Sequence, residues 1–239
     1  MNKTEINFEN YWDCLDDKFD ELIKNGYVKL PSIANLDLKQ ISSQISSQIS
    51  DKTYTELNDE HKMFIGNLLL EKKLAPKLFN FAKKNFGYKG LISNQYHVAR
   101  LATPGEHKYR AHFDSHIFTL VIPLQIPTSF NKNESIGELI FFPNMRPFPK
   151  NEFIDFMGKL WTKQYSSNSG IKKLVKKKKI HINSFRDYEP LLFLGNTVFH
   201  ANKPLSLNSE SNRLTLLAHY FDPFPNYSIG SLLRKIRLR

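Results

Sequence analysis

Hydrophobic residues in the first part of the chain recur three and four positions apart, which is helical spacing. Over residues about 8–24 this spacing predicts an amphipathic helix, with apolar positions at Phe8, Tyr11, Leu15, Phe19 and Leu22. Gly26 is expected to end this helix, and Tyr27–Pro31 to form a short strand. A second helical pattern covers about 57–86, where Pro76 is expected to break or kink the helix. The front of the chain is therefore predicted to be mainly helical.

From about residue 91 the pattern changes to short β-rich runs separated by Pro, Gly and Asn. Strands are predicted at 95–101, 118–126, 138–142, 190–193 and 213–221. Helices followed by a strand-rich remainder are typical of the α+β class. We expect a single domain over residues 1–239. Its parts are a mainly helical region at 1–90, a strand-rich core at 91–224, a Lys-rich insertion at about 148–185, and a basic tail at 225–239.

The Lys-rich insertion contains a predicted helix, Glu152–Tyr165, and then six lysines within Lys172–Lys179. A run of like charge is typical of a solvated surface. As a functional role, it could instead guide an anionic substrate. We expect the insertion to cover the mouth of the core. The basic tail carries interspersed Leu and Ile, which would permit peripheral contact with a membrane.

The composition narrows the class of protein. A hydrophobic fraction of 41% with 19 Phe in 239 residues favours an aromatic-rich core over disorder. The sequence has no apolar run of roughly 18 residues and no secretory signal pattern. The single cysteine, Cys14, argues against a thiol-based metal site and fits a reducing cytoplasmic setting. The net charge of +11 favours acidic partners.

Two metal-binding residue types lie two positions apart in the segment Ala111–Leu120. Alternate side chains of extended backbone share a face, so His112 and Asp114 can point at one ion. His200 follows a predicted buried strand and turn, and supplies a second imidazole. Two histidines and a carboxylate on one face of an octahedron leave open positions, as in non-haem Fe(II) oxygenases. His116 competes with His112, because it is also two positions from Asp114.

Further along the chain, Arg213 and Thr215 share one face of a predicted strand. A guanidinium can hold a carboxylate through two parallel hydrogen bonds, and a hydroxyl can add a third. A dicarboxylic keto acid could therefore chelate iron at one end and be held by Arg213 and Thr215 at the other.

In this order and spacing, the residues resemble the Fe(II)/2-oxoglutarate-dependent oxygenases. The resemblance covers roughly residues 95–224, and its pieces are His112–Asp114, Phe118–Leu120, Gly137–Pro143, Phe199–His200 and Arg213–Pro223. It implies a double-stranded β-helix, a cupin-like jelly roll, with N-terminal helices packed on it. The phytanoyl-CoA hydroxylase-like and prolyl-hydroxylase-like branches of the family both remain open.

The same resemblance implies a dioxygenase activity. 2-Oxoglutarate would be decarboxylated to succinate and CO2 while a C–H bond of the substrate is hydroxylated, with Fe(II) as cofactor and ascorbate as a candidate reductant. The carboxylate of Asp114 favours hydroxylation over halogenation, since related halogenases carry a small residue at this position. Candidate contacts are Thr119, Arg100 and Tyr96 for 2-oxoglutarate, and His116 and His219 for substrate.

The sequence leaves the substrate and the oligomeric state open. Its positive charge favours a small, anionic or conjugated substrate. A nucleic-acid-modifying oxygenase would use Lys172–Lys179 and the basic tail to follow phosphates, but no recognisable nucleic-acid-binding motif is present. A non-catalytic jelly-roll binding protein and a hydrolytic zinc enzyme are also compatible with the pattern. A zinc site would leave Arg213 without an evident role.

Overall fold

The computed structural model describes the greater part of the chain. The described residues are 8–34, 38, 42–43, 45, 54–56, 65–66, 68–105, 110–127 and 134–224. The basic tail expected at 225–239 and the start of the helix expected from residue 57 lie outside them. Among the described residues, no helix is long and apolar enough to cross a membrane.

The helical front of the chain consists of short segments in series. They are α1 (Phe8–Tyr11), the 3-10 helix η1 (Trp12–Lys18), α2 (Phe19–Asn25), the π-helical η3 (Leu70–Leu74) and α5 (Ala75–Phe86). Gly26 ends α2 in the left-handed conformation, with φ of 78°, and its N–H donates to the Leu22 carbonyl. Pro76 lies in the first turn of α5, directly after the π-helical η3, and the α-helix continues beyond it to Phe86.

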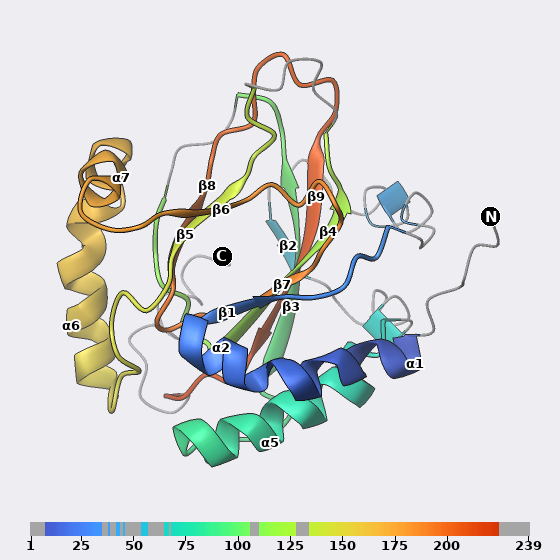
Figure 1. Ribbon diagram of the computed structural model, residues 1–239, viewed down its shortest axis with the longest axis vertical. Helices are drawn as coiled ribbons and strands as arrows, with labels where there is room; N and C mark the ends of the chain where they lie inside the picture. Colours follow the sequence, from blue (N-terminus) through green and yellow to red (C-terminus); the bar gives the residue numbers. More distant parts are fainter. Residues whose placement is uncertain are drawn as a thin grey trace.

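The strands form two antiparallel sheets (Figure 1). The larger has the order β1 (Tyr27–Lys29), β7 (Leu191–Leu194), β4 (Phe118–Gln125), β9 (Arg213–Tyr220), β3 (Gln95–Ala102) and β2 (Tyr54–Glu56). The smaller has the order β6 (His181–Asn183), β5 (Leu139–Phe142) and β8 (Phe199–Asn202). Helices with antiparallel sheets confirm the mixed α and β content expected from the sequence.

The outer face of the larger sheet packs against the N-terminal helices. Its buried residues on β4, β7 and β9 occupy alternate, even-numbered positions: Phe118, Leu120, Ile122, Leu192, Leu194, Leu214 and Leu216. They share one apolar cluster with Trp12, Leu15 and Leu78 of the helices. In Figure 1, α1, α2 and α5 lie together along this side of the sheet. This cluster is the main hydrophobic core.

The inner face of the larger sheet looks towards the smaller sheet. The odd-numbered Val121 and Phe193 cluster with Leu139 and Phe141 of β5. By the same alternation, the odd positions of β4 and β9 and the even positions of β3 turn inward. Inward positions include Thr119, Thr215, His219, Arg213, Tyr96 and Arg100. The space between the sheets therefore combines an apolar cluster with most of the polar candidates.

The Lys-rich insertion forms α6 (Glu152–Thr162), the 3-10 helix η4 (Lys163–Tyr165) and α7 (Asn168–Val175). Ile171 and Leu174 of α7 pack against Phe142 and Phe199 on the outer side of the smaller sheet. Figure 1 shows α6 and α7 along this edge of the molecule. α7 thus covers the outside of the smaller sheet, while α6 contacts Arg146 and Ser115, and the expected placement of the insertion over the mouth of the core stays a prediction.

Candidate metal centre

His112 and His200 are brought side by side by their own backbones. The N–H of each donates to the carbonyl of the other at 3.0 Å, a two-residue antiparallel bridge that continues β8 onto the segment before β4. Directly opposed residues of such a bridge project their side chains to the same side. The two imidazole centroids are accordingly 4.5 Å apart.

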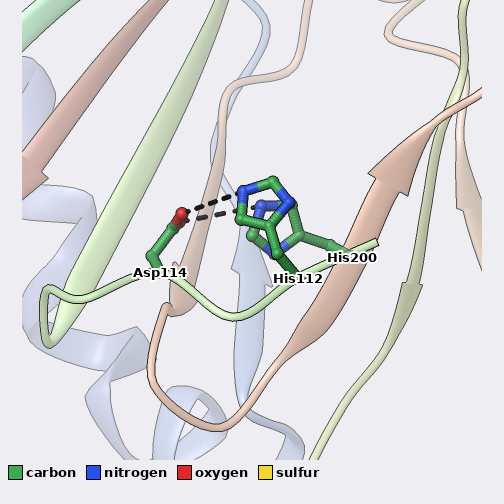
Figure 2. A group of neighbouring side chains, drawn as sticks. All are labelled: His112, Asp114 and His200. Carbon is green, nitrogen blue, oxygen red and sulfur yellow. Dashed lines mark ion pairs between the residues drawn. The ribbon is translucent and has the colours of Figure 1, made fainter. Parts of the chain in front are cut away.

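Asp114 completes the group two residues further along. Its N–H donates to the Gly195 carbonyl at 3.0 Å, which fixes its backbone at the turn after β7. Its carboxylate oxygens lie 3.4 Å from Nε2 of His112 and 3.7 Å from Nε2 of His200. The candidate ligand atoms of the three residues all lie within 4.8 Å of one another, and Figure 2 shows them converging.

The orientation of both imidazoles suits a cation. Nδ1 of His112 is 2.7 Å from the Arg110 carbonyl, and Nδ1 of His200 is 3.2 Å from the Val198 carbonyl. A carbonyl accepts only, so each Nδ1 carries a proton, and each Nε2 faces Asp114. A backbone carbonyl behind the metal-binding imidazole is the usual support in metal sites. The donor set therefore fits a divalent ion of the Fe(II) type.

The charge states also suit metal binding. Burial lowers the pKa of His200 to about 4, despite the nearby carboxylate of Asp114, so its imidazole is neutral at neutral pH. Burial acts to raise the pKa of Asp114, but the adjacent histidines outweigh it and hold that pKa well below its usual range. A neutral imidazole beside an ionised carboxylate is the state in which both bind a cation.

Thr119 supports Asp114 from β4. Its hydroxyl donates to Oδ2 of Asp114 at 2.5 Å and lies 3.1 Å from Nδ1 of His219. The same Oδ2 is 3.9 Å from that nitrogen. Thr119, expected to contact 2-oxoglutarate, thus lies directly behind the carboxylate of the triad. His219, expected near the substrate, lies beside the same oxygen.

His116 and Tyr96 lie next to this group. The ring of Tyr96 stacks on His219 at 5.1 Å and on His116 at 5.7 Å. His116 is buried rather than placed at an open pocket mouth. Among the described residues, the group that could hold a metal ion contains His112 and not His116. The geometry therefore favours His112 over its competitor.

Arg213 lies in a second polar region between the sheets. Its guanidinium donates to the Gly137 carbonyl, and its Nη1 is 3.4 Å from Oδ1 of Asn202. Its Cζ lies 5.2 Å from the centre of the Phe185 ring. Arg213 and Thr215 are only 4% and 3% exposed, which excludes a surface ion pair for this guanidinium. A buried guanidinium beside a hydroxyl is a ready partner for a carboxylate.

A narrow recess surrounds this guanidinium. Its lining residues are Arg100, Ala102, Gly137, Asn202, Lys203, Arg213 and Thr215. Three of the seven are cationic, so the recess suits an anion. His200 and Asn202 are two residues apart on β8 and thus share a face. The recess therefore follows the triad along one strand.

Sequence reasoning assigned no role to several residues at these two sites. A Cβ at Gly195 would lie 2.7 Å from the His116 carbonyl and 2.9 Å from Cβ of Asp114, so only glycine permits this close turn. Asn202 and Lys203 line the recess, yet neither forms a sequence motif. The Leu-Gly-Asn turn before His200 was the one available signal, since a glycine after a buried strand can indicate close backbone approach.

Comparisons with known proteins show which solved structures have a similar fold. No protein-family model and no curated protein sequence matches the chain. Solved structures do. A prolyl-4-hydroxylase from Pseudomonas putida is 13% identical with a TM-score of 0.52, covering 87% of this chain and 98% of that one. A prolyl hydroxylase from Trichoplax adhaerens, in complex with a hypoxia inducible factor peptide fragment, is 14% identical with a TM-score of 0.55, covering 93% and 96%.

A third neighbour has a different reaction in its name. The non-heme alpha ketoglutarate dependent epimerase SnoN, from nogalamycin biosynthesis, is 14% identical with a TM-score of 0.50, covering 88% of this chain and 83% of that one. At such identities the likeness establishes a shared fold. The expected resemblance to Fe(II)/2-oxoglutarate oxygenases is therefore confirmed at the level of fold, together with a His-Asp-His triad.

Proposed function

We propose that this protein is a non-haem Fe(II)- and 2-oxoglutarate-dependent dioxygenase, with residues 1–239 as one domain. Its two sheets would be the two halves of a double-stranded β-helix. The observation that carries the proposal is that two different sites lie next to each other along β8. A cation site of two histidines and a carboxylate is followed, on the same face of the strand, by a buried cationic recess. A dicarboxylic keto acid has the two ends that these sites require.

In this proposal His112, Asp114 and His200 would hold Fe(II), and three protein ligands would leave room for a keto acid and for dioxygen. The bound iron supplies the oxidative chemistry, with ascorbate as a reductant that keeps it Fe(II). Arg213 and Thr215 would hold the distal carboxylate of 2-oxoglutarate, with Arg100 alongside in the recess. The two-hydrogen-bond geometry of a guanidinium suits a carboxylate better than a lysine would.

Other inward residues would shape the substrate side of the iron. Thr119 would keep the Asp114 carboxylate in place through its hydrogen bond. His116, His219 and Tyr96 form a stacked group beside that carboxylate and would meet the substrate or the co-substrate there. Hydroxylation of a small, anionic or conjugated molecule is the proposed reaction. The substrates to screen range from peptides to small molecules, because one neighbour is in complex with a peptide fragment and another is from nogalamycin biosynthesis.

The test is succinate formation from 2-oxoglutarate by the Fe(II)-loaded protein, screened over anionic small molecules, carrier-linked conjugates and prolyl peptides. The proposal expects Fe(II)-dependent succinate release that a true substrate increases, and that Asp114→Ala abolishes. His181→Ala is the matched control, because His181 lies on β6 outside the triad and should leave the rate unchanged. Equal succinate release by Asp114→Ala and the wild type would remove the triad from the reaction.

A further inference from the structure

The helix α6 presents its apolar side to solvent. Its large hydrophobic residues have high exposed fractions: Phe153 71%, Trp161 60%, Met157 48%, Leu160 47%, Ile154 46% and Phe156 37%. The side that faces the protein contains buried Asp155 and Thr162 instead. At 100° per residue the exposed apolar residues cover an arc of roughly 160°. This is the reverse of an ordinary surface helix, whose apolar stripe packs on the core.

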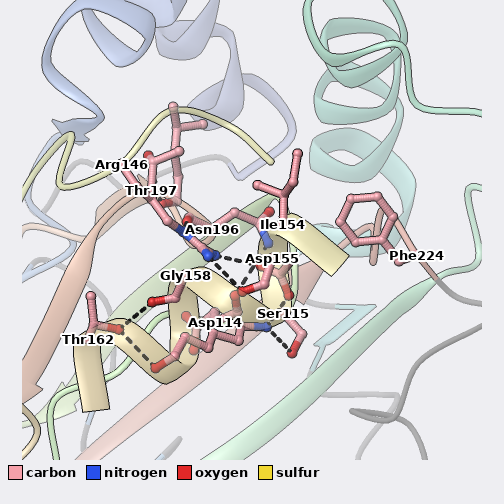
Figure 3. Close-up of polar contacts among 12 residues, drawn as sticks. Asp114, Ser115, Arg146, Ile154, Asp155, Gly158, Thr162, Asn196, Thr197 and Phe224 are labelled. Atoms are coloured by element: carbon pink, nitrogen blue, oxygen red, sulfur yellow. Dashed lines mark hydrogen bonds and ion pairs between the residues drawn. The ribbon is translucent and has the colours of Figure 1, made fainter. Parts of the chain in front are cut away.

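Ion pairs hold α6 in this orientation. The Asp155 carboxylate accepts from Arg146 at 2.6 Å and pairs with Lys159 at 2.7 Å. Lys159 also donates to the Ser115 hydroxyl at 3.2 Å, next to Asp114 of the triad (Figure 3). Rotating the apolar side inward would separate these charges and leave the buried carboxylate without its partners, which is costly. The outward apolar side is thus built into the fold.

Arg146 also holds α6 in place. Besides the Asp155 carboxylate, it donates to the backbone carbonyls of Asn196 at 2.6 Å and Asp155 at 3.0 Å. Gly158 makes room for this guanidinium, because a Cβ at Gly158 would lie 2.5 Å from Nη1 of Arg146. The helix therefore sits on a guanidinium that is tied to the turn before His200, as the close-up in Figure 3 shows.

The segment that follows α6 is strongly basic. Six exposed lysines lie within Lys172–Lys179, here called the lysine segment, and Lys163 of η4 is exposed as well. From Phe156 to Arg186 the sequence contains no Asp or Glu. α7 and η4 are in contact, and Figure 1 places α6 and α7 at the same edge of the molecule. An exposed apolar helix and a concentration of positive charge thus occupy one edge.

We propose that α6 and the lysine segment form a docking surface for an anionic lipid bilayer. Exposed Phe, Trp, Leu and Met on a helix that lies along a surface are typical of interfacial membrane helices. Lysines close to the surface add electrostatic attraction to anionic headgroups. A second copy of this chain fits less well, because it would bring an equal lysine segment to the contact. This inference does not depend on the proposed function.

Trp161 makes the proposal directly measurable. The chain has two tryptophans, and Trp12 is 1% exposed in the main core, so a change in emission on binding reports Trp161. The full-length protein would be titrated with phosphatidylcholine vesicles with and without phosphatidylserine. We expect a blue shift and co-sedimentation with the anionic vesicles, both weakened by salt because the lysine contribution is screened.

Two variants separate the apolar and the charged contributions. Phe153→Ser with Trp161→Ser should abolish co-sedimentation, whereas Leu91→Ser with Leu207→Ser, at equally exposed leucines elsewhere, should not. Replacing the four lysines 176–179 by Gln should weaken vesicle partitioning at least about tenfold. The matched control replaces four exposed lysines outside this edge by Gln: Lys72, Lys73, Lys84 and Lys89.

The vesicle experiments either support or overturn the docking surface. Binding to anionic vesicles that both α6 and lysine-segment variants weaken, and their controls do not, supports the docking surface. Wild-type protein that stays in the supernatant with anionic vesicles overturns it. A lipid-free dimer in sedimentation velocity that Trp161→Ser dissociates would also overturn it, because the apolar face would then belong to a second copy. Succinate release is measured separately, so failure of docking and failure of the proposed activity are distinguishable.

Discussion

The two faces of the six-stranded sheet are made by the same strands but have different compositions. On β4 and β9 the even positions are Phe, Leu, Ile, Ala and Tyr packed against helices, with Leu120 and Leu216 fully buried. The odd positions of the same strands include Thr119, Arg213, Thr215 and His219. Because side chains alternate in a strand, one element can build the main core and carry the chemistry at once.

This difference separates stability from chemistry. Apolar burial on the outer face drives folding, while the inner face buries polar groups that are costly unless they are satisfied. The Thr119 hydroxyl donates a hydrogen bond to the Asp114 carboxylate, and Gly137 and Asn202 accept hydrogen bonds from Arg213. Changes on the inner face and at the triad should therefore alter ligand binding, whereas changes on the outer face should alter the free energy of unfolding.

The largest effect is expected from His200→Ala. Loss of one of three ligands should eliminate Fe(II)-dependent succinate release, since two remaining side chains do not hold the ion facially. The free energy of unfolding of the metal-free protein should stay close to that of the wild type. Calorimetric Fe(II) titration and urea unfolding on the same sample check both parts. Full Fe(II) affinity in His200→Ala would contradict the separation of the two roles.

Leu120→Ala should produce the opposite result. Removing this fully buried outer-face side chain should lower the free energy of unfolding by about 2–5 kcal/mol, through lost burial and a residual cavity. At a temperature where the variant is folded, its Fe(II) affinity should match that of the wild type. Urea unfolding and Fe(II) titration measure the two quantities. A large loss of affinity in folded Leu120→Ala would mean that the faces are not separable.

Arg213→Ala tests the basic end of the inner face. It should weaken 2-oxoglutarate binding by about 10- to 100-fold, in keeping with loss of charge-assisted hydrogen bonds. Fe(II) affinity should be unchanged, because the triad lies further along β8. Arg213→Lys keeps the charge and should lose less. Equal 2-oxoglutarate dependence in wild type and Arg213→Ala would remove this residue from the co-substrate site.

The smallest effect concerns His97, a polar residue on the outer face. Burial lowers its pKa to about 4, and His219 adds to the effect. The unfolded chain takes up this proton near pH 6.5, so it binds more protons than the folded chain between about pH 6.5 and pH 4. Folding stability should therefore fall as pH decreases through this window, by about 2 kcal/mol from His97 between pH 7 and pH 5. In His97→Leu, the free energy of unfolding measured with urea should fall less between pH 7 and pH 5 than it does in the wild type. An equal fall in both proteins would show that His97 is not its cause.

The long strands of the fold could all be predicted from the sequence, and the short ones only in part. β3, β4 and β9 are eight residues each, long enough for strand patterns to appear, and all three were predicted. β2 and β6 have three residues, too few to show a period, and they were missed, whereas the equally short β1 was predicted between Gly26 and Pro31. β8 holds His200 and was not predicted as a strand, because its pairing with β5 depends on residues far away in the sequence.

The orientation of α6 shows a different limit. The helix at Glu152–Thr162 was predicted by its sequence, but its pattern alone would place Phe153 and Trp161 in the core. The ion pairs of Asp155 with Arg146 and Lys159, joined to Ser115, decide otherwise. Such long-range pairs leave no periodic signal. His112 and Asp114 were identifiable because alternate side chains of extended backbone share a face, and His200 because the order of the motifs resembles that of the oxygenases.

The most direct test of the central claim is the visible spectrum of the metal-free protein after anaerobic addition of Fe(II) and then 2-oxoglutarate. The account predicts a weak metal-to-ligand charge-transfer band that requires both additions and is absent from His200→Ala. Its presence would establish chelation of the keto acid at iron held by the triad. Folded wild-type protein that binds Fe(II) and 2-oxoglutarate without this band, or a band retained in His200→Ala, would contradict the proposed site.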